Sequence, residues 1–459
     1  MEKESIKISL IGLYSYAHPE EKMNDRIDKV VKSLRSKNID VNFVGCVVDH
    51  NKSSIQAAKK KLAESVDDSS SILLVFSGWI ESPPVLRIIA DFLHLPILLL
   101  SLAGYYTNNC LISPAGAAGA SLLSQTLNNL GTKHATIYQK VGEDFNLESA
   151  VDLLKFFNSL KRFKGMSIAS VGYACSNLYP FMYDGNVIKK FTGIHVDNLD
   201  LLEIKLLADK VSDKEIEVFI DKFKERVCFV SEPTNKDLEI LAKYSTVMDK
   251  IIDENNYSGI TLKCGSGTGK LLDFTPCMLL SYISDKVEAI CECDVYGLLA
   301  QVIIHELAGI KAMFLEFFEF YEKSVLMASC GFAPFSLCKG ECIKVQGHDW
   351  GSAGGLMNVS ELKTGKVTII NLSVKNGKMC MHLITGNAKT PENFQEEGWK
   401  DSKGPKIPSL EIELDCDMEE FQENIAGPHY IVAYGDITKL MKMYCTFTGI
   451  KFNEHNRID

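Results

Sequence analysis

The sequence predicts an α/β protein in which two doubly wound parallel-sheet domains are followed by a β-rich domain. Apolar runs of strand length alternate with helical patterns through the first two thirds of the 459 residues, as in parallel sheets with crossover helices. The alternation restarts after a Lys/Gly break near residue 164, and beyond about residue 340 short strands and Gly/Asn turns replace the helices. We therefore expect domains over residues 1–163, 164–338 and 339–459.

The first domain contains five predicted strands separated by helical patterns. The strands are expected at residues 6–13, 41–44, 71–76, 97–101 and 135–138. The helices are expected around residues 25–34, 55–63, 84–93 and 116–131. Strands spaced by helices in this way indicate one parallel sheet.

The second domain repeats this pattern, and the third does not. Strands are expected at residues 166–172, 193–198 and 258–262, with helices at 212–226 and 235–253. In the third domain, Asn376-Gly377 lies between two apolar runs, which is the strongest short-range signal of a β-hairpin.

The composition excludes several classes of protein. The net charge is -10 and no block of Lys and Arg is present, so a nucleic-acid surface is not expected. The N-terminus is charged and lacks a signal peptide, and no apolar run approaches the roughly 18–20 residues of a membrane span. We expect a cytoplasmic protein without a membrane partner.

The fourteen cysteines are scattered, and in a reducing compartment most are expected to be buried free thiols. Two pairs, Cys291 with Cys293 and Cys338 with Cys342, have spacings that can indicate zinc. The first pair straddles Glu292 and would face away from the neighbouring acids, so zinc is not the favoured interpretation.

The run of residues 289–297 is the most informative stretch of the chain. It is predicted to be a strand, and Glu292 and Asp294 would then project from the same face. Two close buried carboxylates repel unless they share a proton, meet a basic partner or bind a cation. Oxygen donors suit Mg²⁺ or Mn²⁺, whereas acids at a solvent-exposed strand end would need no partner.

A glycine-rich segment at residues 264–271 resembles a phosphate-binding loop but lacks two of its defining residues. Cys264 stands where the motif needs glycine, and Leu271 stands where it needs serine or threonine. Nucleotide hydrolysis is therefore not expected. Lys263 and Lys270 flank the segment and can meet an anion, although lysines at such places are often simply solvated.

Five segments together resemble the core of L-fucose isomerase-like proteins, the superfamily that includes L-fucose and L-arabinose isomerases. They are residues 291–297 (CECDVYG), 306–309 (ELAG), 329–334 (SCGFAP), 427–436 (GPHYIVAYGD) and 448–450 (TGI). The resemblance implies two flavodoxin-like domains and a C-terminal β-barrel. It also implies aldose–ketose isomerisation through an ene-diol, with Mn²⁺ (or Mg²⁺) bound by carboxylates and a histidine.

Carried over to this chain, the resemblance assigns residues to roles. Asp294 matches the metal-binding carboxylate and is a candidate base, and His429 matches the C-terminal histidine ligand. Glu292 is the candidate second ligand or base. Taken alone, a histidine that opens a strand after Gly-Pro more often has a structural role or is solvated.

Two departures from the family pattern affect the expected metal shell. L-fucose isomerases place a glutamate where this chain reads Thr-Pro-Cys-Met at residues 275–278, and many relatives have histidine at the position of Ser329. Asp273 is a candidate replacement with unconvincing spacing, and Cys277 would be a poor ligand in an oxygen site.

The leading interpretation is a divalent-metal-dependent sugar isomerase. An isomerase of an anionic sulfo- or phospho-sugar such as sulfoquinovose, or a sugar-binding relative without activity, are the alternatives. The resemblance also implies a homo-oligomer whose active sites are shared between subunits. Trp79 is then a candidate to stack on the sugar from a neighbouring subunit, and Lys263 to contact the substrate; a partly buried structural Trp79 is the other interpretation.

Overall fold

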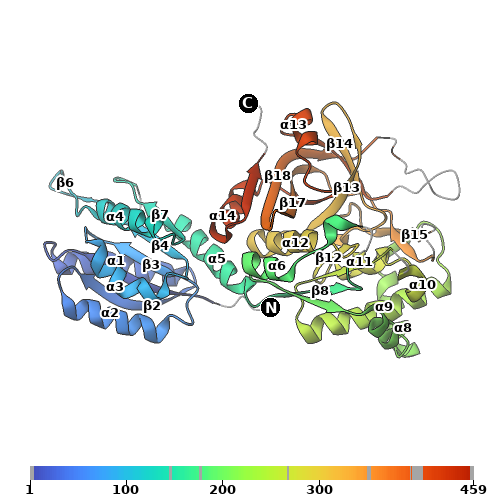
Figure 1. The fold of residues 1–459 in the computed structure, drawn as a ribbon, viewed down its shortest axis with the longest axis horizontal. Coiled ribbons are helices and arrows are strands. Elements are labelled where there is room, and N and C mark those ends of the chain that lie inside the picture. Colours follow the sequence, from blue (N-terminus) through green and yellow to red (C-terminus); the bar gives the residue numbers. More distant parts are fainter. Residues whose placement is uncertain are drawn as a thin grey trace. The chain divides into compact units, whose positions relative to one another are not determined.

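The structure, a computed structural model, describes residues 5–143, 147–174, 178–265, 268–348, 353–392, 394 and 407–454. Its chain divides into two compact units, Met1–Phe163 and Lys164–Asp459 (Figure 1). The predicted fold class is confirmed: both units contain parallel sheets with helices, and the second also contains a closed antiparallel barrel.

The first unit is built on a five-stranded parallel sheet with the strand order β2-β1-β3-β4-β7. A two-stranded antiparallel hairpin, β5-β6, extends from it. The elements are β1 (Ile6–Tyr14), α1 (Glu20–Ser36), β2 (Ile39–Val48), α2 (Lys52–Ser65), β3 (Ile72–Phe76), α3 (Ser82–Ile89), η1 (Ala90–Phe92), β4 (Ile97–Ser101), β5 (Tyr105–Thr107), β6 (Cys110–Ile112), α4 (Gly116–Asn129), β7 (His134–Tyr138) and α5 (Glu148–Phe163).

Alternation along these strands explains how the first sheet is covered. Ile11, Leu13 and Leu74 project to one face, where they pack with apolar residues of α2, α3 and α4. β3 and β4 are buried along their whole length, which is why they read as continuous apolar runs rather than alternating ones.

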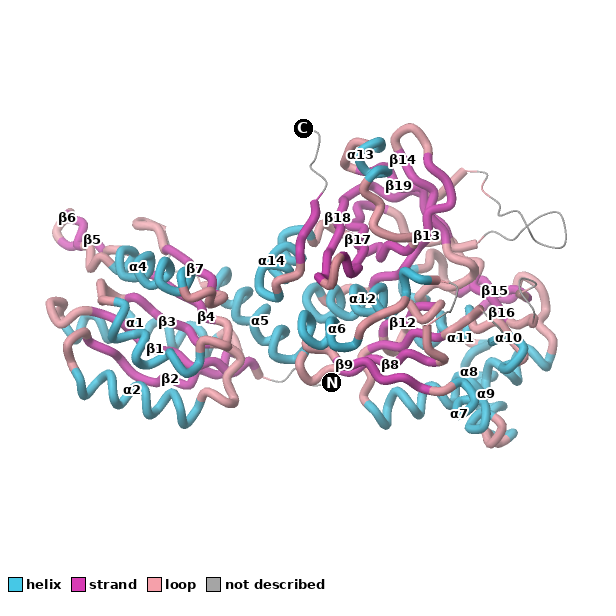
Figure 2. The backbone as a smooth tube through the Cα atoms, viewed as in Figure 1, coloured by secondary structure: helices cyan, strands magenta, loops and turns pink. Residues whose placement is uncertain are grey.

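The second unit contains a four-stranded parallel sheet with the order β12-β11-β8-β9 (Figure 2). The elements up to the barrel are β8 (Ser167–Val171), η2 (Tyr179–Phe181), α6 (Gly185–Thr192), β9 (His195–Leu199), α7 (Leu201–Ala208), α8 (Asp213–Lys224), β10 (Val227–Phe229), α9 (Asn235–Asn255), β11 (Gly259–Leu262), α10 (Thr268–Leu272), α11 (Cys277–Ile283), β12 (Glu288–Cys291) and α12 (Val295–Ala308).

Six antiparallel strands form the barrel in the order β17-β20-β13-β14-β19-β18, and β17 pairs with β18 to close it. Its first two strands precede residue 339, where the β-rich region was expected to begin. The elements are β13 (Ala312–Phe320), β14 (Ser324–Ala328), η3 (Phe335–Leu337), β15 (Ile343–Gly347), β16 (Leu356–Asn358), β17 (Gly365–Lys375), β18 (Lys378–Lys389), β19 (Ser409–Leu414), α13 (Met418–Glu423), β20 (His429–Tyr434), α14 (Thr438–Thr448) and β21 (Lys451–Glu454).

Smaller features complete the second unit. β10, β15 and β16 form a separate sheet, and β21 pairs in parallel with β18 at the outside of the barrel. The predicted hairpin is confirmed, because Asn376 and Gly377, with φ of 52° and 69°, make the two-residue turn between β17 and β18.

Cysteine pairing differs in one place from the expectation of free thiols. Cys228 and Cys342 form a disulfide, while the other described cysteines are free. Cys342 is therefore not available to the zinc spacing considered above. No helix among the described residues is long and apolar enough to cross a membrane.

Candidate active site

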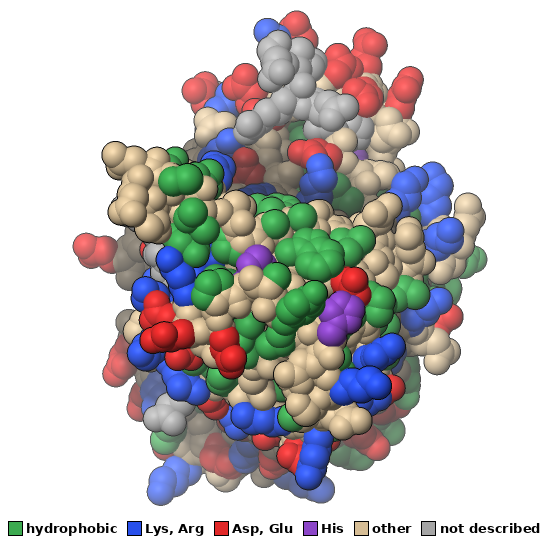
Figure 3. Space-filling model, turned by 90° about the vertical axis from the view of Figure 1, so that its left-hand side faces the viewer, with side chains coloured by type: hydrophobic (Ala, Val, Ile, Leu, Met, Phe, Trp, Pro, Cys, Tyr) green, Lys and Arg blue, Asp and Glu red, His purple; other side chains and the backbone are tan. Residues whose placement is uncertain are grey.

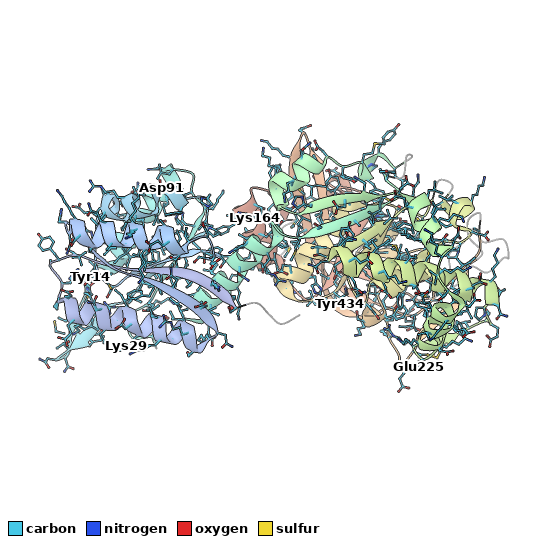
Figure 4. All side chains as sticks on the ribbon, turned by 90° about the horizontal axis from the view of Figure 1, so that it is seen from below. Tyr14, Lys29, Asp91, Lys164, Glu225 and Tyr434 are labelled. Carbon is cyan, nitrogen blue, oxygen red and sulfur yellow. A yellow bond between two sulfur atoms is a disulfide. The ribbon has the colours of Figure 1, made fainter. Side chains whose placement is uncertain are left out.

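Three acidic side chains surround His429 in the second unit. Its Nδ1 lies 2.9 Å from Asp294 Oδ2, and its Nε2 lies 2.9 Å from Glu316 Oε1 and 3.4 Å from Glu292 Oε2. His429 opens β20, whose far end is Tyr434, labelled in Figure 4. The three residues singled out in the sequence, Glu292, Asp294 and His429, are thus brought together, with Glu316 added.

The two acids of the 289–297 run do not lie on a strand, so that expectation was wrong. β12 ends at Cys291, and Glu292 and Cys293 have φ of 63° and 56°, in the left-handed region. L-residues adopt this conformation at a cost, usually where the surrounding structure requires it. This turn, and not the alternation of side chains along a strand, brings both carboxylates to His429.

Asp294 is held by the helix that follows it. It is the N-cap of α12, and its Oδ1 accepts a hydrogen bond of 2.9 Å from the Gly297 amide. Its Oδ2 faces His429, so both oxygens are engaged, and the residue is 3% exposed. A Cβ on Gly297 would lie 2.4 Å from Asp294 Oδ2, so only glycine leaves room for this cap.

Glu316 was missed by the sequence analysis. It lies on β13 directly opposite His429 of β20 in the antiparallel register. Side chains of directly opposed residues share a face with Cβ atoms roughly 5 Å apart, which brings carboxylate and imidazole into contact. In the sequence, Glu316 is distinguished only as an acid within the aromatic run 314–320. Glu319 is an acid in the same run, so the sequence alone does not separate the two.

Two phenylalanines fix the imidazole ring. Phe181 stacks on it with centroids 4.5 Å apart and an interplanar angle of 29°, and Phe314 packs at 4.7 Å and 45°. The side chains of His429 and Asp294 are 2% and 4% exposed, whereas those of Glu292 and Glu316 are 23% and 37% exposed. The site is therefore reached from the side of the two glutamates.

The electrostatics of the site favour a cation. Burial alone lowers the pKa of His429, but hydrogen bonds to Asp294, Glu292 and Glu316 outweigh burial and raise the pKa well above its usual value. Among the described residues, the donor atoms of Glu292, Glu316 and His429 form a group that lies within 4.8 Å of one another. Two carboxylate oxygens and an imidazole nitrogen fit Mn²⁺ or Mg²⁺.

A small pocket adjoins His429 and is lined by the start of α12, by β17 and by the segment before β20. Asp294, Tyr296, Phe181 and Asn371 contribute to its wall. Asn371 donates from Nδ2 to the His429 carbonyl at 2.8 Å, which fixes the beginning of β20.

The other predicted site residues lie elsewhere. Trp79 belongs to the first unit, where it follows β3, is partly exposed and donates its amide to Pro114 O. Lys263 follows β11 and donates its backbone amide to Val171 O, while Lys270 is exposed on α10. Ser266 and Gly267 of the glycine-rich segment lie outside the described residues.

Asp273 does not replace the missing family glutamate. Its carboxylate pairs with Lys236 at 2.6 Å, and both side chains are exposed. Glu316, contributed by the barrel, supplies the additional carboxylate instead.

Comparison with known proteins finds sugar isomerases. The chain is 23% identical over 330 residues to the sulfoquinovose isomerase of Priestia megaterium, covering 70% of this chain and 71% of that protein. It is 21% identical over 326 residues to the sulfoquinovose isomerase of Alkalicoccus urumqiensis, covering 70% and 72%. The chain is thus a distant relative of sugar isomerases, and the prediction of an aldose–ketose isomerase agrees with these relatives. The particular relatives matched are named for an anionic sugar.

No family model matches the chain. An ABC transporter solute-binding protein from Burkholderia multivorans is 10% identical, covering 58% of this chain and 82% of its own, with a TM-score of 0.18. A TM-score this low does not indicate a shared fold.

Proposed function

We propose that the protein is a divalent-metal-dependent aldose–ketose isomerase, with Mn²⁺ or Mg²⁺ held by Glu292, Glu316 and His429. The observation that carries the proposal is the convergence of these three donors within 4.8 Å, in a site that opens on the glutamate side. When bound, such an ion stabilises negative charge on the sugar oxygens as the C2 proton leaves.

In this proposal Asp294 is a positioning residue rather than a ligand. Its Oδ2 accepts the Nδ1 proton of His429, so that once Nε2 loses its own proton as an ion binds, its lone pair is directed at the space beside the two glutamates. The packing of Phe181 and Phe314 against the ring restrains it from turning away. Asp294 is also unsuited to carry a substrate proton, because both its oxygens are engaged and it is buried.

Glu292 is assigned two roles: one carboxylate oxygen binds the ion, and the other acts as the base that moves the proton between C1 and C2 of the sugar. Its carboxylate is farther from Nε2 than that of Glu316, at 3.4 Å against 2.9 Å, and it is partly exposed. A carboxylate in this setting removes the C2 proton to give the ene-diolate and returns the proton to C1, while O1 gains the proton that O2 loses.

An anionic sugar is the favoured substrate class, because the relatives are named as sulfoquinovose isomerases. Lys263, at the carboxyl end of β11, is the candidate to meet the anionic group. Glucose, which carries a hydroxyl in place of the sulfonate, provides the matched neutral substrate.

The decisive experiment incubates the chelator-treated protein with sulfoquinovose and with a panel of neutral aldoses, with and without Mn²⁺, and detects ketose by NMR. We expect Mn²⁺-dependent ketose, with sulfoquinovose preferred over glucose, and a smaller preference in Lys263→Met. Ketose formed equally without metal would contradict the metal site. Sugar binding with no ketose under any condition would indicate a sugar-binding relative without activity.

We also propose a homo-oligomer in which a neighbouring subunit completes each site. The support is the face where the strands of the first sheet end, which exposes apolar side chains (Figure 3). Tyr16 and Tyr106 there are 71% and 64% exposed, and Trp79 follows β3 at the same edge. Light scattering that finds only a fully active monomer at micromolar concentration would overturn this assembly. The cytoplasmic location stays a prediction.

A further inference from the structure

Four thiols and an imidazole gather in the second unit apart from the carboxylate site. They are the side chains of Cys264, Cys277, Cys291, Cys330 and His348, here called the thiol cluster. The sequence analysis did not group these residues, because they are spread over 85 positions and share no motif spacing.

The fold explains why they meet. Cys291 ends β12 and pairs in register with Leu262, the last residue of β11, so that Cys264 lies two residues beyond the same sheet edge. Cys277 opens α11, which packs against β12. Cys330 follows β14.

The contacts form a continuous chain of donors. Cys277 Sγ lies 3.4 Å from His348 Nε2 and 3.5 Å from the Cys330 carbonyl oxygen. The Cys330 thiol also interacts electrostatically with the thiols of Cys277 and Cys291, and the Cys291 thiol with that of Cys264.

Three members of the cluster are buried. Cys277, Cys291 and His348 are 3%, 2% and 1% exposed, whereas Cys264 and Cys330 are partly exposed. A buried cysteine by itself packs as a small apolar residue. Here the thiols of Cys264, Cys277, Cys291 and Cys330 interact pairwise, and His348 Nε2 is directed at Cys277 Sγ, so that soft donors from separate segments adjoin one another.

We propose that the thiol cluster is a second metal site, which takes a thiophilic cation of the zinc class. Thiolate and imidazole are the donors that Zn²⁺ prefers, and a tetrahedral ion needs four of the five donors present. Binding converts the coordinating thiols to thiolates and releases their protons to solvent. The donors are less tightly gathered than those of Glu292, Glu316 and His429, so thiol side chains rotate toward the ion as it binds.

This site differs in chemistry from the proposed isomerase site, although Cys291 directly precedes Glu292 in the chain. The isomerase site offers oxygen and one nitrogen, and the thiol cluster offers sulfur and one nitrogen. Sulfur ligation is therefore the property that separates the two, and the proposal does not depend on the proposed function.

The test uses Co²⁺ as a spectroscopic substitute for Zn²⁺ on the full chain, after chelation and reduction. Thiolate ligands give a near-ultraviolet sulfur-to-cobalt charge-transfer band, which carboxylate and imidazole ligands do not. We expect this band in the wild type, its loss on adding equimolar Zn²⁺, and its loss in Cys277→Ser and Cys330→Ser. Cys445→Ser is the matched control, since Cys445 is 1% exposed and lies next to Met381, outside the cluster.

A second measurement needs no variant. X-ray absorption of the Zn²⁺-loaded wild type should give zinc–sulfur distances of about 2.3 Å, against about 2.0–2.2 Å for nitrogen and oxygen ligands. A zinc shell of nitrogen and oxygen alone, or a charge-transfer band that survives in both cluster variants, would overturn the proposal. Absence of the band from the wild type would do so as well.

Discussion

The parallel sheets of the two units have the same strand arrangement over four strands. In the first unit the order is β2-β1-β3-β4-β7. In the second it is β9-β8-β11-β12, in which the first strand of the sheet, β8, likewise lies second in the order. In such sheets ligands bind beyond the carboxyl ends of the strands. The residues at those ends differ. In the first unit β3 is followed by Ser77, Gly78 and Trp79, whereas in the second β12 is followed directly by Glu292.

The difference shows that strand order sets where a site can form, while the residues just past each strand set its chemistry. The first edge presents aromatic and small side chains suited to packing on a surface. The second edge presents acids, and the barrel adds Glu316 and His429 to them. If this is correct, metal binding and catalysis are confined to the carboxyl end of the sheet in the second unit.

The largest expected effect is on turnover in Glu292→Gln. The amide keeps the shape of the side chain but cannot accept the C2 proton, so turnover should fall by roughly 10²–10⁴-fold, the range typical of general base catalysis. Steady-state kinetics with the substrate found by NMR measures this. Glu319→Gln, an exposed acid on β13, is the matched control and should keep its activity. Equal losses in both variants would remove Glu292 from the mechanism.

Mn²⁺ should stabilise the second unit and leave the first unchanged. An ion that binds only the folded state adds about 2.7 kcal/mol at a concentration of 100 times its Kd. Hydrogen exchange should slow in β13, β20 and the start of α12, with no change in β1 and β3. If exchange slows only in the strands of the first sheet, the ion binds the first unit, and the site at Glu292, Glu316 and His429 is wrong.

Asp294→Asn should weaken Mn²⁺ binding by about 10–100-fold, as expected when a partner that orients a metal-binding histidine is lost. An amide NH₂ facing His429 Nδ1 favours the tautomer with its proton on Nε2, which removes the lone pair from the metal. Asparagine still caps helices well, so the melting temperature without metal should hold. Calorimetric titration measures the affinity. If Mn²⁺ binding is unchanged while thermal stability falls, Asp294 has only a structural role.

The smallest expected effect is on stability in Gly297→Ala. Alanine favours a helix over glycine by roughly 1 kcal/mol, but overpacking costs about 1–3 kcal/mol, so a net loss of about 1 kcal/mol is expected. The new Cβ would displace the Asp294 carboxylate. Gly185→Ala, where a Cβ would meet nothing within 4 Å, is the control and should not destabilise the protein in chemical denaturation. A more stable Gly297→Ala would mean that the cap adjusts freely.

Much of the fold could be predicted because its signals are local. The buried runs of β3 and β4 and the Asn376-Gly377 turn depend on neighbouring residues only. The left-handed pair after β12 could not be predicted, because Glu292 and Cys293 lack the glycine that usually marks such a turn. The site was found in part: His429 and the two acids were grouped through the family resemblance.

Glu316 and the thiol cluster were missed for a physical reason. Glu316 is distinguished from Glu319 only by its pairing with His429 across two strands that lie more than a hundred residues apart. The thiols come from separate segments whose side chains meet only after the sheet and barrel have formed. Neither feature leaves a pattern in the local sequence.

The direct opposition of Glu316 and His429 in the barrel has a consequence for how the protein reaches its native state. A slip of one residue between β13 and β20 would turn the side chains of one strand to the opposite face, so the pair would no longer meet. A cation held by both residues therefore binds only the correctly aligned barrel. If the proposed cation binds there, its binding energy stabilises only the native register of β13 and β20.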